Sequence, residues 1–182
     1  MCKEDSLSLP VKLWQGSDND FTHPAKTVLH NRGIDDYKRY MNLTDDVLYS
    51  PYRLKNIEIA AATLVDHVDL NRTISILVDC DVDGFTSAAI IYNYIKDMGF
   101  TGVIHTLFHI KKKHGLDDPD IKVPEDTKLL IIPDAGSNDV AQCKALYDSD
   151  MDIIILDHHI MEQGNPYAEV VNSQDGSYPN KE

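Results

Sequence analysis

Residues 74–84 read ISILVDCDVDG, a short apolar run that leads into three aspartates within five positions. Two later stretches repeat the pattern of an apolar run that ends at an aspartate. The three runs and their final residues are 74–78 with Asp79, 129–132 with Pro133-Asp134, and 153–156 with Asp157. Apolar runs of this length, bounded by polar residues, are typical of strands that are buried on both faces, as in parallel sheets.

Helical patterns lie before and between these predicted strands. In residues 57–68 the apolar side chains recur at i, i+3, i+4, i+7, i+8 and i+11, which places them on one face of a helix. Further predicted helices are residues 34–41, 88–98 (closed by Gly99) and 140–147, and further strands are residues 102–107 and one that starts at Val170-Val171. Short strands that alternate with helices predict an α/β fold, a doubly wound, mostly parallel sheet flanked by helices.

The three aspartates at the strand ends carry the functional prediction. In an open α/β sheet, ligands bind beyond the carboxyl ends of the strands, near the point where the strand order reverses. If the three strands are neighbours, the carboxylates of Asp79, Asp134 and Asp157 converge on one crevice. Any one of them could equally be a turn former or a helix N-cap. That explanation fits poorly for all three together, because further aspartates and histidines lie beside them.

The first aspartate cluster favours a bound cation. The carboxylates of Asp79, Asp81 and Asp83 repel one another unless a proton or a cation neutralises them, and hard divalent ions take oxygen ligands. The order D-x-D-x-D-G also begins the calcium loop of an EF-hand. That interpretation fails because Ile90 occupies the position of the bidentate glutamate, and because a predicted strand rather than a helix precedes the loop.

Two adjacent histidines add nitrogen ligands. Neutral imidazole binds Mn²⁺, Zn²⁺ or Fe²⁺ more readily than Mg²⁺ or Ca²⁺. A surface pair is the ordinary explanation of two histidines in a row, but His158 and His159 directly follow an apolar strand and Asp157. On an extended segment they would point in opposite directions and have different roles. The mixed ligands predict two metal ions about 4 Å apart, which would activate a water and hold a phosphoryl oxygen.

The segment after Gly84 is a candidate phosphate contact. Thr86 and Ser87 open the predicted helix there, and the ordinary expectation is that they cap it. The free N–H groups at the start of that helix would face the crevice, where they could hold a phosphate.

Charge argues against a free-standing nucleic-acid-binding surface. The net charge is −13, whereas phosphate backbones attract lysine and arginine. Either some of the carboxylates bind metal, or the surface that grips the substrate lies outside this chain. Residues 111–113 are lysines followed by His114, which makes them the most basic segment, and a solvated loop is their more ordinary explanation.

Composition limits the class of protein. The 182 residues, 42% of them apolar, suit one good-sized globular domain with or without an appendage. No apolar run reaches the roughly 18 residues of a membrane helix, and the N-terminus lacks the apolar segment of a secretory signal. Three unevenly spaced cysteines indicate no disulfide framework. The reducing cytoplasm, without membrane contact, is therefore the expected setting.

The ordered set of motifs resembles the DHH phosphoesterase superfamily, and within it the RecJ-like single-stranded-DNA-specific exonucleases. The DHH triplet alone is a weak signal, but the whole set is strong and covers nearly the whole chain. The family motifs are residues 79–87 (DCDVDGFTS), Pro133-Asp134 followed by Ala135-Gly136-Ser137, and Asp157-His158-His159. Segments that resemble the RecJ branch are Asn31-Arg32-Gly33-Ile34, Ser50-Pro51 with the helix near Leu54, His114-Gly115-Leu116, and Val171-Asn172, although Ser173 replaces the proline of that branch.

The resemblance implies metal-dependent phosphodiester hydrolysis with Mn²⁺ or Mg²⁺, and 5′→3′ removal of nucleotides from single-stranded DNA in repair and recombination. The implied metal ligands are Asp79, Asp81, Asp83, Asp134, Asp157, His158 and His159, with Asp157 either a ligand or a group that orients a histidine. The implied catalytic residues are Asp81, Asp134, His158 and His159, and the implied substrate contacts are Thr86, Ser87, His114 and Gly115. One histidine would bind metal and the other the scissile phosphate, and which does which is open.

Two parts of the family pattern have no counterpart in residues 1–182: a fourth motif with a further metal-binding aspartate, and a C-terminal domain that grips the substrate. We therefore expect a fragment, or a naturally split or shortened protein of bacterial or phage origin, completed by that domain in the same or another chain. The expected division is an N-terminal extension, residues 1–56, packed on the core, and a catalytic domain, residues 57–182.

Two other functions share these motifs. DHH phosphoesterases that act on short oligoribonucleotides or cyclic dinucleotides use the same metal chemistry, so only the elements that grip the substrate separate them, and residues 114–116 and 31–34 favour the DNA exonuclease. A DHH fold kept as a non-catalytic replication scaffold would be expected to lose carboxylates of the metal site, whereas the first three motifs are intact here.

Overall fold

The computed structural model describes residues 22–42, 44 and 48–179. Contacts within the chain divide it into two units, residues 1–48 and 49–182. Of the residues that the structure describes, all those in strands lie in the second unit, and so does every predicted site residue. Within the described part of the chain, no helix is both long enough and apolar enough to cross a membrane.

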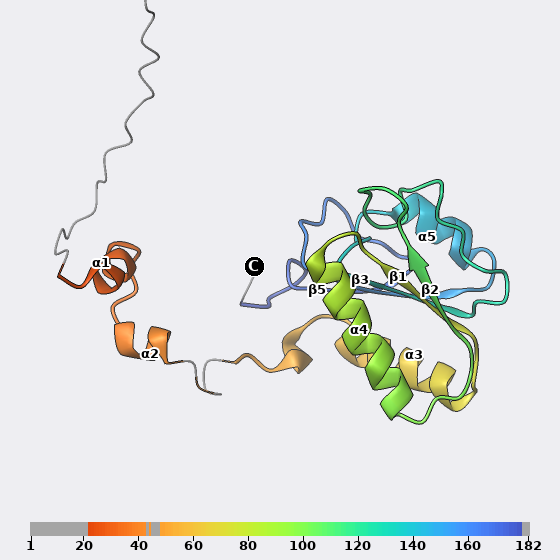
Figure 1. Ribbon diagram of the computed structural model, residues 1–182, viewed down its shortest axis with the longest axis horizontal. Helices are drawn as coiled ribbons and strands as arrows, with labels where there is room; N and C mark the ends of the chain where they lie inside the picture. The colour runs from red at the N-terminus through yellow and green to blue at the C-terminus, as the bar shows by residue number, and fades with distance from the viewer. Residues whose placement is uncertain (1–21, 43, 45–47, 180–182) are drawn as a thin grey trace, which may run out of the picture. The chain divides into compact units, whose positions relative to one another are not determined.

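The first unit contains two short helices, α1 (Pro24–Asn31) and α2 (Tyr37–Met41) (Figure 1). The sequence pattern did not predict α1. It did predict a helix from residue 34, but α2 begins at Tyr37, because the Asp36 side chain accepts a hydrogen bond from Arg39 N at 3.0 Å and caps the helix at that point. The packing of an N-terminal extension on the core stays a prediction.

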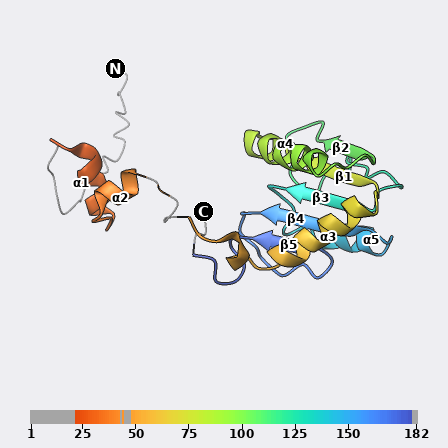
Figure 2. The same ribbon diagram turned by 90° about the horizontal axis from the view of Figure 1, so that it is seen from below.

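The second unit is built on a five-stranded parallel sheet in the order β2-β1-β3-β4-β5 (Figure 2). The strands are β1 (Ile74–Val78), β2 (Ile104–Phe108), β3 (Leu129–Pro133), β4 (Asp152–Asp157) and β5 (Glu169–Asn172). The chain adds β2 on one side of β1 and the later strands on the other, so the strand order reverses between β1 and β3. The predicted doubly wound α/β sheet is confirmed.

Helices cover both faces of this sheet. Figures 1 and 2 show α3 (Ile57–Asp69) and α4 (Val82–Asp97) on one face and α5 (Val140–Tyr147) on the other, and the short 3-10 helix η2 (Pro51–Arg53) precedes α3. Successive strand residues alternate between two apolar clusters: Ile76 packs with the α3 and α4 side, and Leu77 with the α5 side. Because both faces are covered, every residue of β1 and β3 is buried, which explains their unbroken apolar runs.

The start of α4 corrects a prediction. The helix begins at Val82, well before the expected residue 88, because Asp81 is its N-cap: the Asp81 carboxylate accepts a hydrogen bond from Gly84 N at 3.0 Å. Thr86 and Ser87 therefore lie inside the helix. Their hydroxyls donate to the carbonyls of Val82 (2.8 Å) and Gly84 (3.1 Å), so the expectation that they open and cap the helix is wrong.

The contact between β1 and α4 generates a stability prediction. A Cβ added at Gly84 would lie 2.5 Å from the Cβ of Asp79 and 2.8 Å from its backbone. Gly84→Ala should therefore lower the free energy of unfolding by roughly 1–3 kcal/mol through overpacking, although alanine in a helix is ordinarily favoured over glycine. Urea unfolding measures the change. Gly164→Ala, with no heavy atom within 4 Å of the added Cβ, is the matched control, and equal stability of the two variants would contradict the close packing.

Candidate metal centre

Three carboxylates meet at the carboxyl ends of β1 and β3, beside the point where the strand order reverses. Asp79 follows β1, Asp81 caps α4 and Asp134 follows β3. Their ligand atoms lie within 4.8 Å of one another, close enough to bind one ion. The backbone of Asp134 has φ +68°, an uncommon left-handed conformation for a residue other than glycine, and its N–H donates to Leu156 O at 2.7 Å. Hydrogen bonding to β4 thus stabilises the turn that aims Asp134 at the cluster.

The electrostatics of this cluster suit a cation. Burial raises the pKa of Asp134, and the neighbouring charge of Asp81 raises it further. The Asp81 carboxyl has its pKa lowered, first by the hydrogen bond from Gly84 N at the start of α4. The ionised form of Asp81 is therefore stabilised, whereas the ionised form of Asp134 is destabilised by burial and by the charge of Asp81. A divalent cation would relieve that repulsion, and carboxylate with imidazole donors suit Mn²⁺.

A second group of potential ligands shares Asp134. Donor atoms of Asp134, His158 and His159 also lie within 4.8 Å of one another, and His158 Nε2 is 3.3 Å from Asp134 Oδ1. The ring centroids of His158 and His159 are 4.5 Å apart, so both side chains lie on the same side of the chain. The expectation that the two histidines point in opposite directions is wrong, because the chain leaves the extended conformation after Asp157, where β4 ends.

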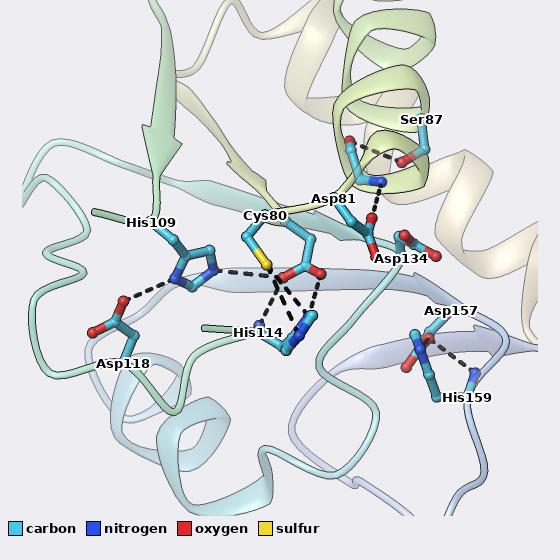
Figure 3. A network of polar contacts seen from close by, with 12 residues as sticks. Cys80, Asp81, Ser87, His109, His114, Asp118, Asp134, Asp157 and His159 are labelled. Carbon is cyan, nitrogen blue, oxygen red and sulfur yellow. Dashed lines mark hydrogen bonds and ion pairs between the residues drawn. The ribbon is translucent and has the colours of Figure 1, made fainter. Parts of the chain in front are cut away.

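Asp157 is positioned to orient this segment. Its side chain is 1% exposed and accepts hydrogen bonds from Ser137 N (3.2 Å) and from the backbone N–H groups of His158 (2.7 Å) and His159 (3.1 Å). It also accepts from His159 Nδ1 at 2.8 Å, and Figure 3 shows Asp157 beside His159. Burial alone would raise the pKa of Asp157, but the hydrogen bonds from Ser137 and His159 outweigh it and the pKa is lowered. The Asp157 hydrogen bond raises the pKa of His159 and leaves Nε2 of that ring as the nitrogen available for a metal or a phosphate.

Contacts with two histidines support Asp79, which is 2% exposed. His114 Nδ1 lies 2.6 Å from one Asp79 oxygen, and Gly115 N donates to the other at 3.3 Å. His109, with a fully buried ring, lies between Asp79 (3.6 Å) and Asp118 (2.9 Å), as Figure 3 shows. The hydrogen bond from His109 lowers the pKa of Asp118. The motif of His114 and Gly115, interpreted as a substrate contact, thus also holds the first metal-ligand candidate.

The sequence patterns missed His109, Asp118, Cys80 and Asn172 as members of the site. Cys80 Sγ lies 3.8 Å from His114 Nδ1, and these two residues with Asp79 form a third group of donor atoms within 4.8 Å. A usable signal existed for His109, because it directly follows β2, as Asp79 and Asp134 follow their own strands. Nothing comparable marked Asp118.

The remaining predicted residues lie around the cluster. Asp83 is exposed in the first turn of α4, and the groups of ligand atoms found among the described residues include neither it nor Asp157. The Asp83 charge nevertheless contributes to raising the pKa of Asp134. An opening of about 260 Å³ is lined in part by His114, Gly115, Asp157 and His159. The predicted substrate contacts His114 and Gly115 therefore face the same space as His159.

Residues 73–178, which contain this entire cluster, match the DHH family, N-terminal domain. The chain belongs to the DHH family. The DHH chain is 40% identical over 166 residues to a protein named single-strand DNA-specific exonuclease YorK, in Bacillus phage SPbeta and in Bacillus subtilis. It is also 24% identical over 165 residues to the single-stranded-DNA-specific exonuclease RecJ of Haemophilus influenzae. These alignments cover 90% and 87% of the DHH chain but only 28% and 29% of the relatives, so the chain spans less than a third of their length.

Solved RecJ structures share the fold. A structure of exonuclease RecJ bound to manganese superposes with a TM-score of 0.55 at 24% identity, over 69% of the DHH chain and 33% of RecJ. A structure of Thermus thermophilus RecJ in complex with Mn²⁺ superposes with a TM-score of 0.58 at 22% identity. The superposition covers 82% of the DHH chain and 21% of that RecJ chain. The predicted fold and the predicted family are therefore confirmed.

The charge of Asp134 generates the next prediction. A carboxyl whose pKa rises on folding weakens the folded state at any pH where it is ionised. Asp134→Asn should therefore raise the free energy of unfolding of the metal-free protein at pH 7 by an amount on the order of 1 kcal/mol, and with it the melting temperature. Asparagine tolerates the positive φ. The gain should vanish as the pH falls toward about 4, where aspartate itself becomes neutral. The same substitution should abolish the rise that Mn²⁺ produces by mass action in the unsubstituted chain. A variant that is less stable without metal, or still stabilised by Mn²⁺, would contradict this assignment.

Substitution of Asn172 tests the hydrogen bonds that hold the backbone of the segment carrying His158 and His159. Its side chain is fully buried and donates to Ser137 Oγ (2.9 Å) and His159 O (3.0 Å). Asn172→Ala leaves both acceptors unpaired, so we expect a loss of about 1–3 kcal/mol in stability and roughly tenfold weaker Mn²⁺ binding, measured by calorimetry. Asn165→Ala, at another buried asparagine, whose side-chain oxygen accepts from Tyr167 N at 3.2 Å, should leave Mn²⁺ affinity unchanged.

Proposed function

We propose that this chain is the metal-binding part of a hydrolase that cleaves phosphodiester bonds at the 5′ end of single-stranded DNA, with two Mn²⁺ or Mg²⁺ ions. One observation carries the proposal: two groups of donor atoms meet at the strand-order reversal and share Asp134. A carboxylate common to two groups is suited to bridge a pair of ions about 4 Å apart. The YorK and RecJ relatives, named for action on single-stranded DNA, supply the substrate class.

The two groups divide the ligands. Asp79, Asp81 and Asp134 would hold one ion, and Asp134 with His158 and His159 would hold the other. Bound there, such ions supply Lewis acidity toward a phosphoryl oxygen and lower the pKa of a water to make it a nucleophile. The presence of histidines favours Mn²⁺ over Mg²⁺.

The chain's own residues contribute orientation and charge. Asp157 fixes the orientation of the His159 ring through a hydrogen bond to Nδ1, which leaves Nε2 as the ring nitrogen available to an ion or a phosphate. His114 and Gly115 N hold both oxygens of Asp79, which prevents that carboxylate from turning away from the cluster. Pre-oriented groups reduce the reorganisation that the reaction would otherwise require. The hydroxyls of Thr86 and Ser87 already donate to helix carbonyls, so any contact they make to substrate would use their lone pairs.

Charge and length indicate that residues 1–182 need a further domain for efficient action. A net charge of −13 opposes the approach of a phosphate backbone, and the opposition weakens as salt screens it. The relatives are more than three times as long as the part that the chain matches. We therefore propose that a C-terminal domain, in the same chain or another, grips the DNA. The bacterial cytoplasm, including that of a phage-infected cell, is the proposed setting, consistent with the free thiols of Cys80 and Cys143.

An activity panel tests the proposal. With Mn²⁺, the chain should release nucleotides from 5′-labelled single-stranded DNA faster than from duplex DNA, from a short oligoribonucleotide or from a cyclic dinucleotide. Its rate should be low and should rise when the relatives' C-terminal region is supplied. Asp81→Asn should lower the rate roughly a hundredfold or more, because stabilisation of several kcal/mol depends on the ions. Asp97→Asn, an exposed aspartate near the other end of α4, should have no effect.

Two outcomes would overturn this assignment. Preferential cleavage of oligoribonucleotides or cyclic dinucleotides would keep the metal chemistry and replace the substrate. No Mn²⁺-dependent hydrolysis of any member of the panel, even with the C-terminal region supplied, would leave the non-catalytic scaffold as the better interpretation.

A further inference from the structure

Two phenylalanines beside the metal centre are half exposed although they contact each other. Phe85 lies in the second turn of α4 and Phe108 ends β2, the edge strand of the sheet. Each is 51% exposed, and their rings lie 5.8 Å apart with an angle of 31° between the ring planes. Aromatic pairs of this kind ordinarily bury their rings in a core or an interface. This pair instead leaves about half of each side chain exposed.

The pair lines an opening that also reaches the metal-ligand candidates. The opening has a volume of about 530 Å³, and its lining includes Asp79, Asp81, Phe85, Phe108, Lys111 and Lys112. The volume lies within the range of ordinary ligand sites. Carboxylates, aromatic rings and ammonium groups thus surround one space, in a chain whose net charge is otherwise strongly negative.

We propose that Phe85 and Phe108 form a stacking surface for a nucleobase next to the phosphodiester to be cleaved, and that Lys111 and Lys112 bind a neighbouring phosphate. The proposal rests on the proposed function and adds to it the way in which a single strand is recognised. A base has an apolar, polarisable face that stacks on phenylalanine whatever its identity, and the adjoining phosphates bear the charge that complements the two lysines. An apolar peptide would satisfy the rings but not the ammonium groups.

The same surface accounts for a preference for single strands. Bases of a duplex already stack on their neighbours, so a duplex would have to unstack before one of its bases could reach the rings. A single strand has unstacked bases available. The stacking surface would therefore favour single-stranded substrate without reading its sequence.

The experiment compares two single strands of equal length and equal phosphate number. One is oligothymidylate and the other is abasic, both with phosphorothioate linkages to slow hydrolysis, and binding to the whole chain in Mn²⁺ is followed by fluorescence anisotropy. The unsubstituted chain should bind oligothymidylate roughly tenfold more tightly than the abasic strand. Phe85→Leu and Phe108→Leu should each remove most of that preference. Tyr147→Leu, which alters an aromatic of similar exposure at the end of α5, should retain it.

Two further variants complete the design. Lys111→Gln with Lys112→Gln should weaken both strands alike and reduce the dependence of binding on salt. Phe108→Trp preserves stacking, so oligothymidylate should quench its additional fluorescence, relative to the background from Trp14, and the abasic strand should not. This variant keeps the test valid if a leucine variant fails to fold.

Equal affinity for the two strands, or a preference that survives both leucine variants, would overturn the stacking surface. Failure of the underlying function is recognised separately, by hydrolysis of bis(4-nitrophenyl) phosphate, a diester without a base. If the unsubstituted chain cleaves that diester in Mn²⁺ but shows no preference for bases, only the stacking surface is wrong. If it prefers bases but, even with the relatives' C-terminal region supplied, cleaves neither this diester nor DNA, the stacking surface stands and the proposed hydrolysis is wrong.

Discussion

Crowding of negative charge at the carboxyl ends of β1 and β3 is the constraint on which the site depends. The parallel register places Asp79 and Asp134 side by side at the carboxyl ends of their strands. Asp81, the N-cap of α4, lies next to them. Burial raises the pKa of Asp134 and the neighbouring charge of Asp81 raises it further, a cost to the folded chain that a divalent cation would reverse. The fold tolerates this cost because two apolar clusters, one on each face of the sheet, stabilise it independently.

Around this cluster, hydrogen bonds within the protein hold the segments that carry the ligand candidates. Asp157 accepts from the segment that carries His158 and His159, and Asn172 joins that segment to Ser137. His109 binds Asp118 through Nδ1, whereas its buried Nε2, 3.6 Å from Asp79, has no hydrogen-bond partner among the described residues. Buried polar networks of this kind specify one geometry, since an unpaired member would cost more than its bond contributes. The ligand candidates are therefore pre-oriented before any ion or substrate arrives.

Charge distribution links the metal centre to the way a substrate approaches. The net charge of the chain opposes a polyanion, yet Lys111 and Lys112 line an opening that also contains Asp79, Asp81 and the half-exposed rings of Phe85 and Phe108. Attraction is thus local, and stacking needs no net positive charge. The matched YorK and RecJ relatives are more than three times as long as the aligned part, and the C-terminal domain proposed above would supply further binding energy.

The sequence by itself determined the sheet, its helices and the family, because buried parallel strands require unbroken apolar runs and their ends are marked by aspartates. It also identified Asp79, Asp81, Asp134, His158 and His159, which the structure brings together. It did not determine how α4 starts, which way His158 and His159 turn, or that His109, Asp118 and Phe108 adjoin the cluster. Those features arise from contacts between residues far apart in the chain, and a pattern read along one strand or helix contains no information about which other segment will be packed against it.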